Sequence, residues 1–557
     1  MKITAKVISP LEKVLYTDKP TKFKSYKSST ALIGEKADFE VLYFTEEFAQ
    51  NAYTACNVFV QAKLYRDGKE TDTSCVTVSK IDHMPSVYPG VQFEMPDNYI
   101  STAPGLYPDL LVPIDEKTPV SALPRIASSL WISIDTKNLE GGKYTAEISI
   151  SNDTDETIVT VSHILKVIPV SLPEQQLTVT QWLHTDCIAD YYHIDVFSEE
   201  YWTAAENLVR LSVDSGSKMI YTPLFTPPLD TNPGEERTTV QLVDVAETKE
   251  GYAFGFEKLR RWVEMCLRCG AEAFEMSHLF TQWGAFHAPK IMAGTKQIFG
   301  WDTDAAGKPY ERFLSQFLPA LCKEIRELGI ADKTVFHISD EPELKHLESY
   351  RSASRIVHKY LKGFNVMDAM SHTAFYEEKL VDIPVPHIVY FDKFSNKSIK
   401  PCWVYYCGAQ KKSMGRAFGM PSLRNRISGS QFYAHKIDGF LHWGFNFYNT
   451  ARSTRKINPY AVTDAGMKFP SGDSFMVYPA PNFAFYSSIR LEVFRQGIDD
   501  MRALWLCEKL CGREATEKVL SDLNGGQPLN INDTPADKEF TLKMRKIINL
   551  MIEKNAK

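Results

Sequence analysis

The sequence contains no run of about 20 apolar residues, the length that a helix needs to cross a bilayer. Its first residues, Met1 to Lys6, lack the apolar segment that is typical of a signal peptide. We therefore expect no membrane insertion and a cytoplasmic location, with secretion as the alternative if a signal peptide has been removed.

An excess of positive charge is also missing, because the formal net charge is −6. A chain without a basic excess has little to attract nucleic acid, so we expect no nucleic-acid partner. The chain contains no glycine-rich phosphate loop of the Rossmann or P-loop type. We therefore expect no cofactor. An assembly of two identical chains is compatible with this composition.

Metal-binding motifs are scarce. The ten cysteines are dispersed, and the CxxC pair Cys266 and Cys269 has no second pair with which to form a zinc site. No His-Glu-x-x-His occurs, and His184-Thr185-Asp186 departs from the His-x-His that metal-dependent barrel hydrolases commonly show after their first strand. The sequence thus predicts no catalytic metal.

The first part of the chain shows the alternation of β-strands. Tyr144–Ser151 alternates polar and apolar residues with a period of two, and Trp131–Asp135 and Thr157–Ser162 are similar. Such runs between turn signals are typical of an antiparallel β-sandwich.

From Leu177 onward, apolar strands alternate with amphipathic helices that end at glycines such as Gly270 and Gly329. This alternation predicts a (β/α)8 TIM barrel. The eight expected strands are Leu177–Trp182, Lys218–Thr222, Ala273–Ser277, Thr334–Ile338, Asn365–Ala369, His387–Phe391, Trp403–Cys407 and Gly439–Trp443.

The two patterns together predict a multidomain protein. We expect a β-sandwich domain over residues 1–172, a catalytic barrel over 173–512, and C-terminal helices packed on the barrel over 513–557. A barrel of this type carries its chemistry at the C-terminal ends of its strands.

Polar and aromatic side chains follow those strand ends, which is the composition of a carbohydrate pocket. Aromatic faces suit the C–H side of a sugar ring, and polar groups suit its hydroxyls. Besides an acid pair after strand four, the expected substrate-binding residues are His278, Trp283, Tyr390, Tyr405, Trp443, Asn446 and Asp473. For each of them a structural role, in the barrel core or in a turn, is the alternative.

The acid pair is Asp340-Glu341, followed by Pro342. Two carboxylates can divide acid and base work when one stays ionised and the other holds a proton. A retaining glycosidase with its own nucleophile needs two carboxyls about 5–5.5 Å apart, usually on different strands. Neighbouring acids suit substrate assistance better, with Asp340 holding the N–H of the sugar's 2-acetamido group and Glu341 as general acid/base.

A β-sandwich followed by a barrel with Asp-Glu-Pro after strand four resembles glycoside hydrolase family 123. Trp443–Asn446, Gly472–Pro479 and Ser488–Gly497 also resemble motifs of that family. The resemblance implies an exo-acting β-N-acetylgalactosaminidase, with Asp340 and Glu341 as its catalytic pair. The implied partner is a glycan or glycolipid with a terminal β-linked GalNAc.

Two other functions fit the same pattern. One is a glycosidase of other sugar specificity on this scaffold, and the other is a catalytically inactive barrel that binds glycans. Arg490, Glu492 and Arg495 lie two and three residues apart on an expected helix, so we interpret them as salt-bridging scaffold.

Overall fold

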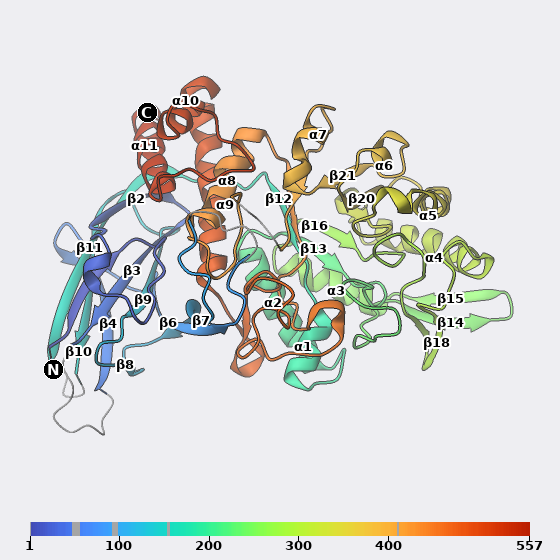
Figure 1. Cartoon of the computed structure of the whole chain (residues 1–557), viewed down its shortest axis with the longest axis horizontal. Helices are drawn as coiled ribbons and strands as arrows, with labels where there is room; N and C mark the ends of the chain where they lie inside the picture. The colour runs from blue at the N-terminus through green and yellow to red at the C-terminus, as the bar shows by residue number, and fades with distance from the viewer. Residues whose placement is uncertain (1, 47–55, 92–97, 153–155, 409–411, 557) are drawn as a thin grey trace.

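The computed structural model describes residues 2–46, 56–91, 98–152, 156–408 and 412–556. The chain forms an N-terminal region of two β-sheets and a C-terminal barrel, and helices near the C-terminus lie against the sheets (Figure 1). Within the described part of the chain, no helix combines the length and the apolarity that a membrane crossing requires.

The N-terminal sheets are largely antiparallel and share one hydrophobic core. The first sheet has the order β1 (Thr4–Ile8), β3 (Lys36–Phe44), β9 (Ser128–Asp135), β6 (Val76–Ser86) and β7 (Gly105–Ile114). The second has the order β2 (Ser28–Ile33), β11 (Thr157–Ser171), β10 (Gly142–Ser151), β4 (Cys56–Arg66) and β5 (Lys69–Glu70), with β8 (Val120–Ala122) paired to β4. One pair, β2 with β11, is parallel. The three strands predicted here lie within β9, β10 and β11.

The C-terminal region contains the expected parallel sheet of eight strands. Its order is β21 (Ile383–Pro386), β20 (Asn365–Met370), β19 (Thr334–Phe336), β16 (Ala273–Met276), β13 (Met219–Thr222), β12 (Thr178–Gln181), β23 (Gly439–His442) and β22 (Trp403–Tyr405). A single bridge between His387 and Tyr405 brings the two edge strands together. The sheet is therefore a nearly closed barrel.

One of the eight predicted strands is wrong. The segment predicted as His387–Phe391 forms the 3₁₀ helix η4 (Ile388–Tyr390) and the start of α7 (Phe391–Ser395), and the strand is β21 just before it. Pro384 and Pro386 conceal this strand from sequence reasoning, because proline removes a ladder donor and is tolerated mainly at edges. The position next to the incomplete seam makes β21 such an edge.

The helices of the barrel region follow its strands. They are α1 (Thr185–Tyr192), α2 (Glu199–Asp214), α3 (Glu257–Arg268), α4 (Lys308–Glu327), α5 (Leu347–Tyr360), α6 (Ala374–Glu377), α7, α8 (Leu423–His435) and α9 (Ile489–Cys511). Two further helices, α10 (Arg513–Leu523) and α11 (Phe540–Asn555), complete the chain. Gly270 and Gly329 have φ values of 93° and 69°, as expected for residues that follow a helix end.

The loops contain short strands and 3₁₀ helices. They are the hairpins β14 (Asp244–Thr248) with β15 (Gly251–Gly255), β17 (Ile291–Ala293) with β18 (Lys296–Phe299), and β24 (Tyr478–Pro479) with β25 (Phe485–Tyr486). The other 3₁₀ helices are η1 (Pro20–Lys22), η2 (Ala331–Lys333), η3 (Leu344–His346), η5 (Ala451–Ser453) and η6 (Pro481–Phe483).

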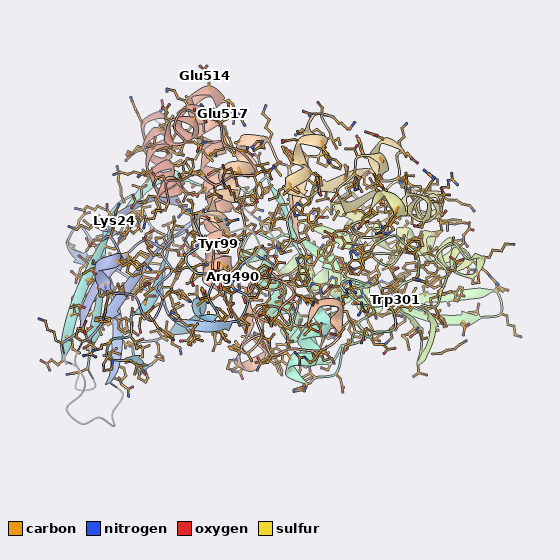
Figure 2. The ribbon with its side chains drawn as sticks, in the orientation of Figure 1. Lys24, Tyr99, Trp301, Arg490, Glu514 and Glu517 are labelled. Atoms are coloured by element: carbon orange, nitrogen blue, oxygen red, sulfur yellow. The ribbon has the colours of Figure 1, made fainter. Side chains whose placement is uncertain are left out.

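Buried ion pairs join the two regions through α9, which confirms the scaffold interpretation of its charged residues. The Arg490 guanidinium donates to both carboxylate oxygens of Asp109 in β7, at 2.8 and 2.9 Å. Arg495 pairs with Asp38 in β3 and with Glu492 on its own helix. Figure 2 shows Arg490 in the middle of the molecule, between the N-terminal sheets and the barrel.

Truncation of Arg490 should therefore destabilise the whole protein. Arg490→Ala leaves the Asp109 carboxylate buried without its cation, which typically costs about 3–5 kcal/mol. Thermal and urea unfolding would measure the shift of the midpoint. Glu517→Ala is the control, because Glu517 pairs with Arg513 on the outer helix α10 (Figure 2) and a surface pair contributes about 0–1 kcal/mol. Equal shifts for the two variants would contradict this account of the interface.

Candidate active site

The acid pair lies at the C-terminal end of β19, on the loop that leaves the barrel. The backbone N–H of Glu341 donates to the carbonyl of Ala369 at 3.2 Å, and the carbonyl of Asp340 accepts from the N–H of Trp283 at 2.9 Å. Glu341 has a φ of 46°, a left-handed conformation that is uncommon for a glutamate. The neighbouring strands thus hold the pair in a strained backbone, as is frequent at functional sites.

The two carboxylates differ in their partners. The Tyr405 hydroxyl donates to Glu341 Oε1 at 2.6 Å, and the Cys407 Sγ lies 3.7 Å from the same oxygen. Among the residues that the structure describes, none donates a hydrogen bond to the Asp340 carboxylate. Both acids are partly accessible to solvent. Asp340 therefore presents an open acceptor beside a glutamate that is already oriented.

Burial raises the pKa of Asp340 well above its usual range, and the negative charges of Glu341 and Asp368 raise it further. Two adjacent carboxylates in a partly dry site resist carrying two charges at once. The pair therefore retains a proton at a pH at which isolated aspartates have lost theirs, and this property is required of a general acid.

A fully buried ion triad lies beneath the pair. The imidazole of His337 contacts Asp368 Oδ1 through Nδ1 at 2.8 Å and Glu275 Oε1 through Nε2. Burial alone would lower the pKa of His337, but the charges and hydrogen bonds of Glu275 and Asp368 raise it to about 10. His337 is therefore an imidazolium held between two carboxylates.

The triad positions the chain that leads to the acids. Asp368 accepts hydrogen bonds from the backbone N–H groups of Ile338, at 3.2 Å, and Ser339, at 3.1 Å, and from the Tyr350 hydroxyl. Glu275 accepts from the indole N–H of Trp182 at 2.7 Å. These contacts fix the two residues before Asp340 against β20 and the barrel interior.

Sequence reasoning missed Glu275 and His337. The signal for Glu275 was present, because a glutamate in the apolar run Ala273–Met276 must be paired if the run is buried. Its partner His337 directly follows β19, the neighbouring strand of the sheet, and sequence spacing alone does not reveal that neighbour.

Two of the predicted residues, His278 and Trp283, follow β16 and lie beside the ion triad and the acid pair. His278 is buried, its Nδ1 is 3.0 Å from the Tyr221 hydroxyl, and its ring stacks on His337 with centroids 4.3 Å apart. Burial and the charge of His337 lower the pKa of His278 well below its usual range, so it is neutral. Trp283 is 36% exposed and touches the pair through its backbone bond to Asp340.

Three predicted residues lie around the end of β23. The half-buried indole of Trp443 donates to Asp473 Oδ2 at 3.1 Å, and Asp473 is itself buried. Asn446 is fully buried, and its amide bonds the backbone N–H of His184 at 2.8 Å and its carbonyl at 2.9 Å. Asn446 is thus committed to the loop after β12, whereas Trp443 presents part of its ring.

The two predicted tyrosines lie in different surroundings. Tyr405 is buried and bound to Glu341, whereas Tyr390 is 37% exposed on η4 with the ammonium of Lys393 4.8 Å from its ring centroid. The displacement of strand six to β21 accounts for this, because Tyr390 follows the strand instead of lying within it. The structure brings together Asp340, Glu341, Trp283 and Tyr405, with His278 beneath them.

One cluster in the described residues has metal-ligand geometry, since ligand atoms of His278, His337 and Asp368 lie within 4.8 Å of one another. Both ring nitrogens of His337 are already engaged by carboxylates, and an imidazolium has no lone pair to give a metal. We therefore interpret this cluster as two members of the ion triad with the ring of His278 stacked on one of them.

A pair of carboxylates at the strand ends of a parallel barrel is an arrangement that a glycoside hydrolase can use. The model of the catalytic domain of glycoside hydrolase family 123 matches residues 182–507. The chain belongs to this family. No curated protein matches it.

A solved structure of the family shares the fold of this chain. A family 123 glycoside hydrolase from Clostridium perfringens, from a study of glycolipid glycan hydrolysis, aligns with a TM-score of 0.76 and 16% identity, over 99% of this chain and 98% of that one. An endo-β-1,4-mannanase from Thermotoga petrophila aligns with a TM-score of 0.34 and 12% identity, over 59% of this chain and 77% of that one. A β-glucuronidase from Parabacteroides merdae aligns with a TM-score of 0.30 and 11% identity, over 89% and 54% respectively.

The raised pKa of Asp340 has a consequence for stability. Because its pKa is higher in the folded state than the ordinary 3.8, the folded protein loses stability as the pH rises from that value through the raised pKa. Asp340→Asn should therefore stabilise the protein by about 0.5–2 kcal/mol at pH 8, the range typical of relieving a strained functional group. The gain should shrink toward pH 5.

Unfolding midpoints at pH 5, 6.5 and 8 would measure this difference. Asp392→Asn, at an exposed aspartate on α7, is the matched control and should show no such trend. A gain for Asp340→Asn that is the same at every pH would contradict the assignment of a strained charge to Asp340.

Proposed function

We propose that the chain is an exo-acting β-N-acetylgalactosaminidase that releases terminal β-linked GalNAc with retention of configuration. The observation that carries the proposal is the open Asp340 carboxylate next to Glu341, which Tyr405 orients at 2.6 Å. Both acids leave the barrel from the same strand, so they approach one sugar from one side. This suits a reaction in which the sugar supplies its own nucleophile.

In this mechanism the acetamido oxygen attacks the anomeric carbon while the glycosidic bond breaks. Glu341 gives its proton to the leaving oxygen, and Asp340 accepts a hydrogen bond from the acetamido N–H and balances the positive charge of the oxazolinium. Glu341 then takes a proton from water. The oxygen of this water attacks the anomeric carbon and opens the oxazolinium ring, which restores the acetamido group. Two displacements return the original configuration.

Substrate binding would relocate the proton within the pair. Without a ligand, burial favours the proton on Asp340. An acetamido N–H needs an ionised acceptor, and a glycosidic oxygen needs a donor, so the bound sugar draws the shared proton to Glu341. The Tyr405 hydroxyl donates to the Glu341 carboxylate before the proton arrives, and again after Glu341 has given that proton to the leaving oxygen. Burial and the charge of Glu341 raise the pKa of Tyr405, so the phenol remains a donor.

The family and the fold support a carbohydrate substrate, and we propose a glycan or glycolipid with a terminal β-GalNAc. We keep Trp443 and Trp283 as proposed walls for the sugar and its aglycone, because each leaves part of an indole uncovered. His278 and Asp473 are proposed as supports of these groups, since both are buried against other residues of the site.

We also propose that residues 1–172 form a β-sandwich domain, 173–512 the (β/α)8 barrel, and 513–557 the helices packed on it. A hydrophobic core formed by the sheets alone supports the first boundary. The last boundary coincides with Gly512, which separates α9 from α10.

A panel of p-nitrophenyl glycosides tests the proposal. We expect release from the β-GalNAc glycoside and at least about 100-fold slower release from the β-galactoside, because only the former carries the internal nucleophile. Comparable release from both would refute substrate assistance. No release from any sugar would leave a glycan-binding barrel as the function.

The role of Glu341 as acid predicts a dependence on the leaving group. Glu341→Gln should lower kcat/KM by about 10²–10⁴-fold on substrates with poor leaving groups, and much less on activated aryl glycosides that leave without a proton. Steady-state kinetics on both substrate classes measures this difference. Glu343→Gln, at an exposed glutamate paired with Lys345 on the same loop, is the control. Equal losses on both classes would exclude Glu341 as the acid.

A further inference from the structure

A third carboxylate, Asp230, is connected to the acid pair through two adjacent residues. Its backbone N–H donates to the side chain of Gln282, and the backbone N–H of the next residue, Trp283, donates to the carbonyl of Asp340. Asp230 lies on the loop that follows β13, and it is partly accessible to solvent. Its charge contributes to the raised pKa of Asp340, and the charge of Glu341 contributes to the raised pKa of Asp230. The three carboxylates thus share one electrostatic environment although they come from two different loops.

The backbone of Asp230 is held in a costly conformation. Its φ is 42°, in the left-handed region. Its N–H donates to the side-chain oxygen of Gln282, and its carbonyl accepts from the Ser453 hydroxyl at 2.8 Å. Contacts from the loops after β16 and β23 therefore fix this aspartate, and such over-determined strain is typical of functional positions.

The side chain of Asp230 uses one of its oxygens. Oδ2 accepts from the backbone N–H of Arg452 at 2.8 Å. No hydrogen bond from the described residues reaches Oδ1. If Asp230 only stabilised a turn, Oδ2 alone would be sufficient, and the side-chain oxygen of an asparagine could replace it. The second oxygen remains available to accept a hydrogen bond on a residue that is partly accessible to solvent.

The surroundings of Asp230 keep it from being an ordinary surface acid. Burial raises the pKa of Asp230 to about 6, and the negative charge of Glu341 also raises it. The hydrogen bond from the Arg452 backbone and the positive charges of Arg237 and Arg452 lower this pKa but do not cancel the effect of burial. A carboxylate in such a place accepts a hydrogen bond from a neutral hydroxyl strongly, because little water competes for it.

We propose that Asp230 is a substrate-contacting residue whose free oxygen, Oδ1, accepts a hydrogen bond from a ring hydroxyl of the sugar held by Asp340 and Glu341. The inference rests on the proposed function, since it places the same sugar at the same pair. It adds a specificity determinant, because a site built to bind a hydroxyl rejects a sugar that lacks it.

The test combines Asp230→Asn with substrates that each lack one hydroxyl. Asparagine can keep the bond to Arg452 and tolerates a positive φ, so the loop should survive. Activated aryl β-GalNAc glycosides deoxygenated at C3, C4 or C6 are compared with the parent glycoside. For wild type, one of the three should lose about 10- to 100-fold in kcat/KM, as expected for a hydrogen bond to a charged group.

Asp230→Asn should show the same loss on the parent glycoside and almost no further loss on that one deoxy glycoside. Glu236→Gln is the matched control, because Glu236 is an exposed acid of the same loop paired with Lys290. An unfolding midpoint for each variant separates misfolding from lost contact. If Asp230→Asn loses equally on the parent and on all three deoxy glycosides, or loses nothing, the inference is overturned.

These outcomes are distinct from a failure of the proposed function. If wild type cleaves no β-GalNAc glycoside, the proposed activity fails, and the assignment of Asp230 to that sugar falls with it. If wild type cleaves the parent glycoside but tolerates each deoxygenation, the activity stands and the role of Asp230 alone is wrong.

Discussion

The charge of His337 is the constraint on which the site depends. An imidazolium between Glu275 and Asp368 offsets part of the charge of two carboxylates that the barrel interior could not otherwise hold. Once Asp368 is anchored, it can accept the backbone N–H groups of Ile338 and Ser339. The direction in which the chain leaves β19 follows from these bonds, and so does the place of the acid pair. Protein dipoles and charges are thus arranged before any sugar arrives, which is the usual source of catalytic electrostatics.

The N-terminal sheets contribute to this arrangement from a distance. Besides Asp109, the Arg490 guanidinium bonds the carbonyls of Gly472 and Phe475, each at 2.6 Å. Asp473, which follows Gly472, accepts a hydrogen bond from the indole N–H of Trp443. Polar contacts therefore lead from β7 through α9 to Trp443, which we propose as a wall of the sugar site. Through Arg490, the sheets thus help to fix the position of the loop that binds Trp443.

Sequence patterns were sufficient where a local rule determines the structure. Glycines after helices, apolar runs of strand length and the position of Asp340-Glu341 at a strand end each have a local physical cause. Patterns failed where the cause is a neighbour in space. Pro384 and Pro386 conceal a strand that is tolerated because of its place at the seam. Asn446 sits in a motif that resembles a sugar contact, yet its amide serves the backbone of His184. The partners of Glu275 become visible only when three strands are aligned.

The seam between β21 and β22 makes the barrel asymmetric. A regular ladder joins β21 to β20, but a single bridge, His387 to Tyr405, joins it to β22. Amide groups along this edge have fewer protected partners than those elsewhere in the sheet, so hydrogen exchange should begin there. Tyr405, which closes the seam, also holds Glu341. Local opening between β21 and β22 would therefore disturb the hydrogen bond between Tyr405 and Glu341 directly. How often Glu341 loses this hydrogen bond would depend on how often the two strands separate.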